Sequence, residues 1–308
     1  MYKHSVIIIT YNQENYIADA IESVLQQNPP PFEIIIGDDC SRDKTPEILE
    51  NYRQKFPEII KVIRHSQNQG IFKNFNFLMD KVNGDVISGL AGDDLYKPGL
   101  FNALNKAIEA NNLNPVNDSF SIVTNTVLLY PNGKEVIFDN YRIRKNSMFK
   151  ERLRYGLSYR EVGFSKKLWN NINPIPLNYG VFGDWLFGFD QVVKCKKFIF
   201  INEVSSVYRL GVGMTSHANV KEFSTSRLQV LDEILIRYSD IIESDDIRYV
   251  KFEKSKINYN ANPSIANYFK VAFWLLLNAN NFSVNNNFNK HWKLLIPNFI
   301  KKIAKKIV

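Results

Sequence analysis

The chain has 308 residues, and 45% of them are hydrophobic, so it can bury a large core and is not an intrinsically disordered segment. Its formal net charge of +8 at pH 7 suits nucleic acid, a membrane surface or anionic substrates, but no nucleic-acid-binding motif accompanies the charge. The two cysteines form no metal-binding or redox spacing. Without a signal-peptide pattern in the first four residues, they predict a reducing, cytosolic compartment.

The first third of the sequence alternates β-branched runs with amphipathic stretches. Residues 5–9 are apolar and β-branched, as in a strand buried on both faces. Further strands are predicted at residues 33–36, 59–64 and 86–90, and helices at residues 17–25, 45–56, 72–82 and 98–108. This alternation predicts an α/β fold with a Rossmann-like, doubly wound, mainly parallel sheet.

The pattern changes after about residue 115. Residues 120–130 and 134–138 flank Pro131-Asn132-Gly133 and predict an antiparallel hairpin. The later elements are predicted as a basic, mobile stretch at 142–154, a helix at 182–195, strands at 198–201 and 204–208, and helices at 228–238 and 265–277. We therefore expect a catalytic domain over residues 1–218, with halves at about 1–112 and 113–218, and a C-terminal helical region over 219–308.

Polar residues follow three of the predicted strands, at the point where each strand ends. They are Thr10, Tyr11, Asn12, Asp38, Asp39, Asp93 and Asp94. Ligands of doubly wound sheets bind at the carboxyl ends of the strands. Each cluster alone could be a solvated turn, but three of them at one edge predict a ligand site.

The carboxylates at this edge suggest a nucleotide and a divalent cation. Asp39 can accept a hydrogen bond from a base edge or a ribose hydroxyl, although an Asx turn is the alternative. Mg²⁺ or Mn²⁺ takes one or two protein carboxylates and completes its shell with water and phosphate oxygens. We expect Asp94 to be the direct ligand and Asp93 to face the ribose or a metal-bound water. No Walker loop and no Gly-rich dinucleotide fingerprint occurs.

Residues 6–104 resemble the inverting family 2 glycosyltransferases of the GT-A fold, of the type that builds bacterial surface polysaccharides. Four segments carry the resemblance: Thr10-Tyr11-Asn12, the run from Asp38-Asp39 to Asp43-Lys44-Thr45, Asn68-Gln69-Gly70 followed by Lys73 and Asn74, and Gly84-Asp85 through Asp93-Asp94. Gly92 departs from the family pattern, because many members carry a third acidic or small polar residue there.

The resemblance implies roles for particular residues. Nucleotide binding is implied for Thr10, Tyr11, Asn12, Asp39, Asn68, Gly70, Lys73, Asp93 and Arg209, and metal binding for Asp94 and Asp93. Asp39 would hold the uracil edge, and Arg209, in a glycine-containing loop, would contact the diphosphate. His217 lies near the position of a family histidine, where a surface histidine is the alternative to a metal role.

The catalytic base implied by the resemblance is Asp184, at the start of the helix predicted over 182–195. A base there removes the acceptor hydroxyl proton as the hydroxyl attacks the anomeric carbon. The alternative is a helix N-cap, and the two roles are compatible. Asp190 is the rival carboxylate, and we expect it to pair with Lys194, four residues on.

Residues 290–308 place apolar side chains near one helical face with lysines opposite. This pattern fits either an interfacial helix on anionic lipid or a helix packed on the catalytic domain. We therefore expect a cytoplasmic protein that is peripheral on the inner face of the cell membrane.

The resemblance implies a metal-dependent, inverting transferase of a hexose from a nucleotide sugar, most simply a UDP-sugar, with Mn²⁺ or Mg²⁺. The expected acceptor is a saccharide or lipid-linked saccharide of an O-antigen, capsule or similar polymer. There are two alternatives. One is a nucleotidyl- or phosphotransferase that uses the same carboxylates, and the other is a non-catalytic, membrane-attached scaffold that binds a nucleotide sugar.

Overall fold

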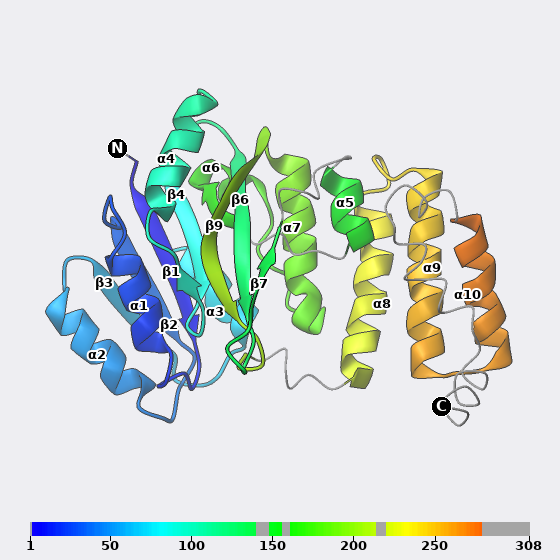
Figure 1. Ribbon diagram of the computed structural model, residues 1–308, viewed down its shortest axis with the longest axis horizontal. Coiled ribbons are helices and arrows are strands. Elements are labelled where there is room, and N and C mark those ends of the chain that lie inside the picture. The colour runs from blue at the N-terminus through cyan, green and yellow to red at the C-terminus, as the bar shows by residue number, and fades with distance from the viewer. Residues whose placement is uncertain (1, 140–147, 156–160, 214–219, 279–308) are drawn as a thin grey trace. The chain divides into compact units, whose positions relative to one another are not determined.

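The computed structural model describes residues 2–139, 148–155, 161–213 and 220–278 (Figure 1). Tertiary contacts divide the chain into two compact units. One unit comprises residues 1–178 with 183–217, and the other comprises residues 179–182 with 218–308. His217 and the helix predicted within 290–308 lie outside the described residues.

The first unit contains a nine-stranded mixed sheet, in the order β3-β2-β1-β4-β8-β6-β9-β5, with β7 paired to β6. Strands β1 to β4 pair in parallel, whereas β8 pairs antiparallel with both β4 and β6. The strands are β1 (His4–Thr10), β2 (Glu33–Asp38), β3 (Ile60–Arg64), β4 (Val86–Ala91), β5 (Leu95–Tyr96), β6 (Phe120–Leu129), β7 (Glu135–Phe138), β8 (Glu161–Ser165) and β9 (Lys197–Arg209).

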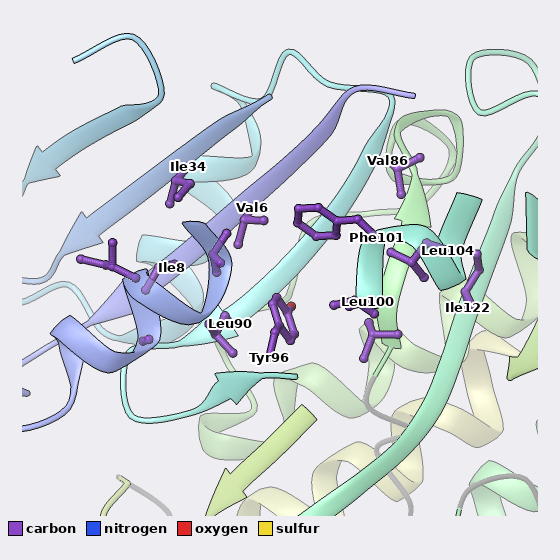
Figure 2. Close-up of a cluster of buried hydrophobic side chains, with 14 of the residues drawn as sticks. Val6, Ile8, Ile34, Val86, Leu90, Tyr96, Leu100, Phe101, Leu104 and Ile122 are labelled. Carbon is purple, nitrogen blue, oxygen red and sulfur yellow. The ribbon is translucent and has the colours of Figure 1, made fainter. Parts of the chain in front are cut away.

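Helices pack on both faces of this sheet, because successive side chains of its central strands point to opposite sides. The helices of this unit are α1 (Ile17–Leu25), α2 (Thr45–Lys55), α3 (Ile71–Met79), α4 (Leu100–Ala110), α5 (Met148–Tyr155), α6 (Lys166–Asn171) and α7 (Gly183–Lys194). Val6 and Ile8 of β1 face the cluster formed with α1, α2 and α4 (Figure 2). Ile7 of β1 faces the second cluster, with α3, α6 and α7.

The second unit is helical. It comprises a 3-10 turn at Gly180–Phe182 and the helices α8 (Val220–Arg237), α9 (Ser244–Ala261) and α10 (Ile265–Leu277). α9 packs against both α8 and α10. Within the described ranges, no helix combines the length and apolarity needed to cross a bilayer.

Three expectations about local structure are wrong. The two strands expected at 198–201 and 204–208 are the single strand β9, whose pairing with β6 shifts register where the polar residues between them lie. Part of the basic stretch expected to be mobile forms α5, where Arg152 is only 4% exposed. Asp190 is buried on α7 while Lys194 is exposed, and no ion pair joins these two described residues.

Candidate active site

The residues that directly follow β2 and β4 form hydrogen bonds to the last two residues of β1. The Asp39 N–H donates to the Thr10 carbonyl at 2.9 Å, and the Gly92 N–H donates to the Ile9 carbonyl at 2.9 Å. These bonds continue the parallel register in which Thr10 lies opposite Asp38 and Ile9 lies opposite Ala91. The structure therefore brings the three predicted polar clusters to one edge of the sheet.

The turn after β1 is locked to the turn after β2. Asn12 has a positive φ of 51°, and its N–H donates to Ser41 Oγ at 2.8 Å while its Oδ1 accepts from the Arg42 N–H at 2.9 Å. Tyr11 is 38% exposed at the same turn. Thr10 Oγ1 is buried and has no hydrogen-bond partner among the described residues. The turn thus presents one exposed aromatic ring and one buried hydroxyl at the sheet edge.

The carboxylate of Asp39 holds the loop of Asn68, Gln69 and Gly70. Its Oδ1 accepts from the Gln69 N–H at 2.7 Å and its Oδ2 from the Gly70 N–H at 2.8 Å. Gly70 has a φ of 89°, a conformation that L side chains rarely adopt. Each carboxylate oxygen keeps acceptor capacity beyond these bonds. Asp39 can therefore fix this loop and still accept a bond from a ligand.

A buried bridge between His65 and Asn74 supports the same loop, and the sequence reasoning assigned no role to His65. His65 Nε2 lies 3.0 Å from Asn74 Oδ1, and the amide of Gln69 lies 2.9 Å from His65 Nδ1. Asn74 Nδ2 donates to the Gly37 carbonyl at 2.8 Å. The sequence position of His65 could have indicated this role, because His65 directly follows β3, just as the predicted polar clusters follow their strands.

The Asp93–Asp94 pair is buried, with exposed fractions of 4% and 3%. The Arg209 N–H donates to Asp94 Oδ1 at 3.0 Å, and Arg209 Nη1 donates to the Asp93 carbonyl at 2.9 Å. The same guanidinium forms an ion pair with Asp19 of α1 at 2.9 Å and lies 5.3 Å from the centre of the Tyr16 ring. Arg209, at the end of β9, therefore holds both aspartates in place through hydrogen bonds. The sequence did not reveal this role of Arg209.

Gly92, the departure from the family pattern, lies in close contact with three neighbouring side chains. A Cβ at this position would collide with Gln13 Oε1 and would lie 3.0 Å from Thr10 Cβ and from Ile17 Cδ1. Gln13 Oε1 ends a flexible side chain that can move away, so the approach to Thr10 Cβ, at the end of β1, is the contact that disfavours a larger residue here.

Two adjacent carboxylates suit Mg²⁺ or Mn²⁺ when a diphosphate supplies the other oxygens. The described residues contain no group of three or more His, Cys, Asp or Glu side chains that could hold a metal ion by themselves. The donor set of Asp93 and Asp94 therefore fits an ion that is shared with a phosphorylated ligand.

Asp184 lies in the first turn of α7 and is half-buried. The preceding residue, Gly183, packs against the ring of Phe72, where an added Cβ would lie 3.0 Å from the ring. Phe72 is two residues beyond Gly70 in the loop that Asp39 holds, and Lys73, the next residue, is exposed. This packing places the start of α7 beside the first turn of α3, next to that loop.

Comparisons with known proteins identify the family and the fold. Residues 5–165, just over half of the chain, match the sequence profile of Glycosyl transferase family 2. A crystal structure of TarS 1-349 from Staphylococcus aureus in complex with UDP-GlcNAc is similar with a TM-score of 0.62 and 23% identity, over 89% of this chain and 79% of that one. The chain has the GT-A fold and belongs to glycosyl transferase family 2.

Two further relatives extend the comparison. TuaG of Bacillus subtilis, named for teichuronic acid biosynthesis, is 40% identical over 93 residues, which are 30% of this chain and 36% of TuaG. The mannosyltransferase PcManGT from Pyrobaculum calidifontis, in complex with GDP-Man and Mn²⁺, has a TM-score of 0.54 and 16% identity, over 99% of this chain and 88% of that one. The chain spans well under half the length of the curated relatives it matches.

Proposed function

We propose that this chain transfers a hexose or hexose derivative from a UDP-sugar to a hydroxyl of a saccharide or lipid-linked acceptor in cell-surface polysaccharide synthesis, with inversion of the anomeric centre. The observation that carries the proposal is the convergence of Thr10, Asp39 and the Asp93–Asp94 pair at one sheet edge, inside the segment that matches the family. TarS, which was crystallised with UDP-GlcNAc, supports a UDP-linked donor.

Asp39 and the turn at residues 10–12 bind the nucleotide in this proposal. Asp39 keeps acceptor capacity for a uracil N–H while it fixes the loop at 68–70. The Thr10 hydroxyl, buried and without a partner in the described part of the chain, supports a bond to the nucleotide. The proposal also assigns nucleotide contacts to Tyr11, Asn12, Asn68, Gly70 and Lys73.

The acidic pair would hold Mn²⁺ or Mg²⁺, with Asp94 as the direct ligand and Asp93 in support. A bound divalent ion would neutralise the charge that develops on the departing diphosphate. Arg209 contributes in two ways, since it positions both aspartates through the contacts described above and its guanidinium has donors left for the diphosphate.

The transfer is a single displacement in which Asp184 is the general base. The acceptor oxygen forms a bond to the anomeric carbon, the bond from that carbon to the diphosphate oxygen breaks with its electron pair leaving on the diphosphate, and the acceptor proton moves to Asp184. No enzyme nucleophile is needed. The position of Asp184 in the first turn of α7, beside the loop at 68–70, supports this assignment.

A donor and product screen tests the proposal. The chain is incubated with Mn²⁺, a panel of nucleotide sugars and saccharide acceptors, and products are identified by mass spectrometry. We expect a glycosylated acceptor and free UDP. Release of pyrophosphate or a phosphorylated acceptor would instead identify a nucleotidyl- or phosphotransferase. Donor binding without any product, across the acceptor panel, would favour the scaffold.

We also propose that the protein works at the inner face of the cell membrane, where a lipid-linked acceptor would be presented. The excess of lysine over residues 290–308 supports contact with anionic lipid.

A further inference from the structure

Helix α10 is apolar nearly all round, although one of its sides is exposed. Val271 and Leu275 are buried at 1% and 0% exposure. Five bulky apolar side chains lie on the other side with exposed fractions between 47% and 78%, and we call them the α10 stripe: Ile265, Phe269, Phe273, Leu276 and Leu277. A helix that is hydrophobic all round is normally buried, so this stripe is expected to have an occupant.

The charge of the sequence from residue 254 onward favours an anionic surface as that occupant. After Glu253 the remaining 55 residues contain nine lysines and no acidic residue. The preceding 253 residues contain 30 basic and 31 acidic residues, so this C-terminal part carries the whole positive excess. Lys270 is exposed on α10 itself, next to Phe269, and Lys251 of α9 lies 5.1 Å from the centre of the Trp274 ring.

We propose that the α10 stripe is a docking surface for an anionic membrane. Five apolar side chains suit the hydrocarbon boundary of a bilayer, while Lys270, Lys251 and the lysine-rich C-terminal sequence suit its phosphate groups, and an anionic bilayer presents both. A soluble anionic polymer would satisfy the lysines but would leave the apolar side chains in water. The surface differs from the amphipathic segment at 290–308, and it does not depend on the transferase activity.

Vesicle flotation of the full chain tests the proposal. We expect binding to vesicles of phosphatidylglycerol and phosphatidylcholine, and little binding to phosphatidylcholine alone. The double variant Phe269→Ser/Phe273→Ser should bind the mixed vesicles at least about tenfold more weakly, because it removes two aromatic anchors. Ile236→Ser on α8, where Ile236 is 72% exposed, is the matched control and should bind as the wild type does.

Two outcomes would overturn the proposal. One is that the double variant binds mixed vesicles as tightly as the wild type. The other is a dimer of the wild type, detected by light scattering without vesicles, that the double variant loses, since the stripe would then join two copies. An unchanged thermal midpoint of the double variant, and unchanged thermal stabilisation by UDP with Mn²⁺, would show that weaker vesicle binding arises from neither unfolding nor a damaged donor site.

Discussion

At the scale of single residues, several side chains of the candidate site form hydrogen bonds with other groups of the protein. Asp39 fixes a loop with both of its oxygens, and Asn74 bridges His65 to the Gly37 carbonyl. Such pre-organisation lowers the cost of ordering the site when the donor binds. It also means that a change at a bridging residue should damage both stability and donor binding.

The Asn74 bridge yields the first prediction. Asn74→Leu removes the partner of two buried polar groups, the Gly37 carbonyl and the His65 ring. We expect the free energy of unfolding to fall by about 1–3 kcal/mol, the usual cost of leaving buried groups unsatisfied. UDP affinity, measured by calorimetry, should fall in the same variant. Asn170→Leu, at an exposed position, is the control and should change neither quantity. A wild-type UDP affinity for Asn74→Leu would contradict the role of the bridge.

Gly92, directly after β4, yields the second prediction, and Gly89 within β4 provides its control. Gly92→Ala displaces the flexible end of Gln13 and places a methyl group 3.0 Å from Thr10 Cβ and Ile17 Cδ1, and overpacking of this kind costs about 1–3 kcal/mol. Gly89→Ala meets its nearest atom, in the Phe75 ring, at an ordinary 3.4 Å. Urea unfolding should show a loss for Gly92→Ala that exceeds any loss for Gly89→Ala. Equal losses would mean that the crowding at Gly92 is not decisive.

At the scale of elements, strand β9 links the acidic pair to helix α1. Arg209, its last residue, bonds to both aspartates and forms an ion pair with Asp19. The two partners differ in burial, since the Arg209 side chain is 15% exposed and the Asp19 side chain 62%. Exposed ion pairs contribute little, so the bond to the Asp93 carbonyl should matter more than the ion pair.

The third prediction separates these two contacts. Arg209→Met removes both guanidinium contacts, and we expect kcat/KM for transfer to fall by at least about tenfold, equivalent to about 1.4 kcal/mol. Asp19→Asn removes only the exposed ion pair and should change kcat/KM by less than about threefold. Steady-state kinetics over a range of Mn²⁺ concentrations would measure both. A larger loss for Asp19→Asn than for Arg209→Met would contradict the role of Arg209 in holding the two aspartates.

Packing of β1 against α4 yields a prediction about pH. His4 is 1% exposed, stacks on Phe101 at 4.5 Å and bonds to Asn105, and burial lowers its pKa below the ordinary value of 6.5. The unfolded chain therefore binds more protons as the pH falls below 6.5. This contribution to stability is complete above pH 6.5 and is lost as the pH falls toward the folded-state pKa. In His4→Gln, the free energy of unfolding should depend less on pH in this window. An unchanged pH dependence would contradict the prediction.

Sequence patterns predicted the elements whose signal is local. The β-branched runs that became β1, β2 and β4 and the turn at 131–133 needed no knowledge of distant partners. Tertiary features were missed. Strand β8 enters the sheet between β4 and β6, far from β4 in the chain, and the buried Arg152 on α5 lies over Gly188 of α7. The local sequence of the basic stretch predicts mobility. It does not reveal that Gly188, distant in the sequence, leaves space for the side chain of Arg152.

The same distinction applies to the candidate site. Strand-end positions located Thr10, Asp39, Asp93 and Asp94, because parallel strands must end at one edge. The second role of Arg209 depends on pairing between β5 and β9 that joins residues more than a hundred positions apart, so no local pattern could reveal it. Nucleotide, metal and base assignments stay predictions, and so does the domain boundary at 218.

At the scale of the whole molecule, the candidate active site and the α10 stripe belong to different units of the chain. Residues 5–165 match the family and contain every predicted nucleotide and metal residue except Arg209, whereas Asp184 and Arg209 lie in the part of the first unit beyond the match. The α10 stripe belongs to the second unit. Donor chemistry and membrane docking should therefore be separable by mutation.

The base assignment yields the fifth prediction. Asp184→Asn removes the proton acceptor but leaves the nucleotide edge of the sheet intact. General-base catalysis contributes about 10²–10⁴-fold, so we expect kcat to fall by at least about a hundredfold while UDP still raises the thermal midpoint. Asp80→Asn, an exposed change at the end of α3, is the control. Wild-type transfer by Asp184→Asn would show that another group takes the proton.

The proposed inverting glycosyl transfer is tested most directly by the anomeric configuration of the product, measured by proton NMR after the chain has acted on a UDP-sugar of known configuration. We expect a glycoside whose configuration at the transferred anomeric carbon is opposite to that of the donor, formed together with UDP. A product that retains the donor's configuration would contradict the single displacement with Asp184 as base, and a phosphorylated product would contradict glycosyl transfer itself.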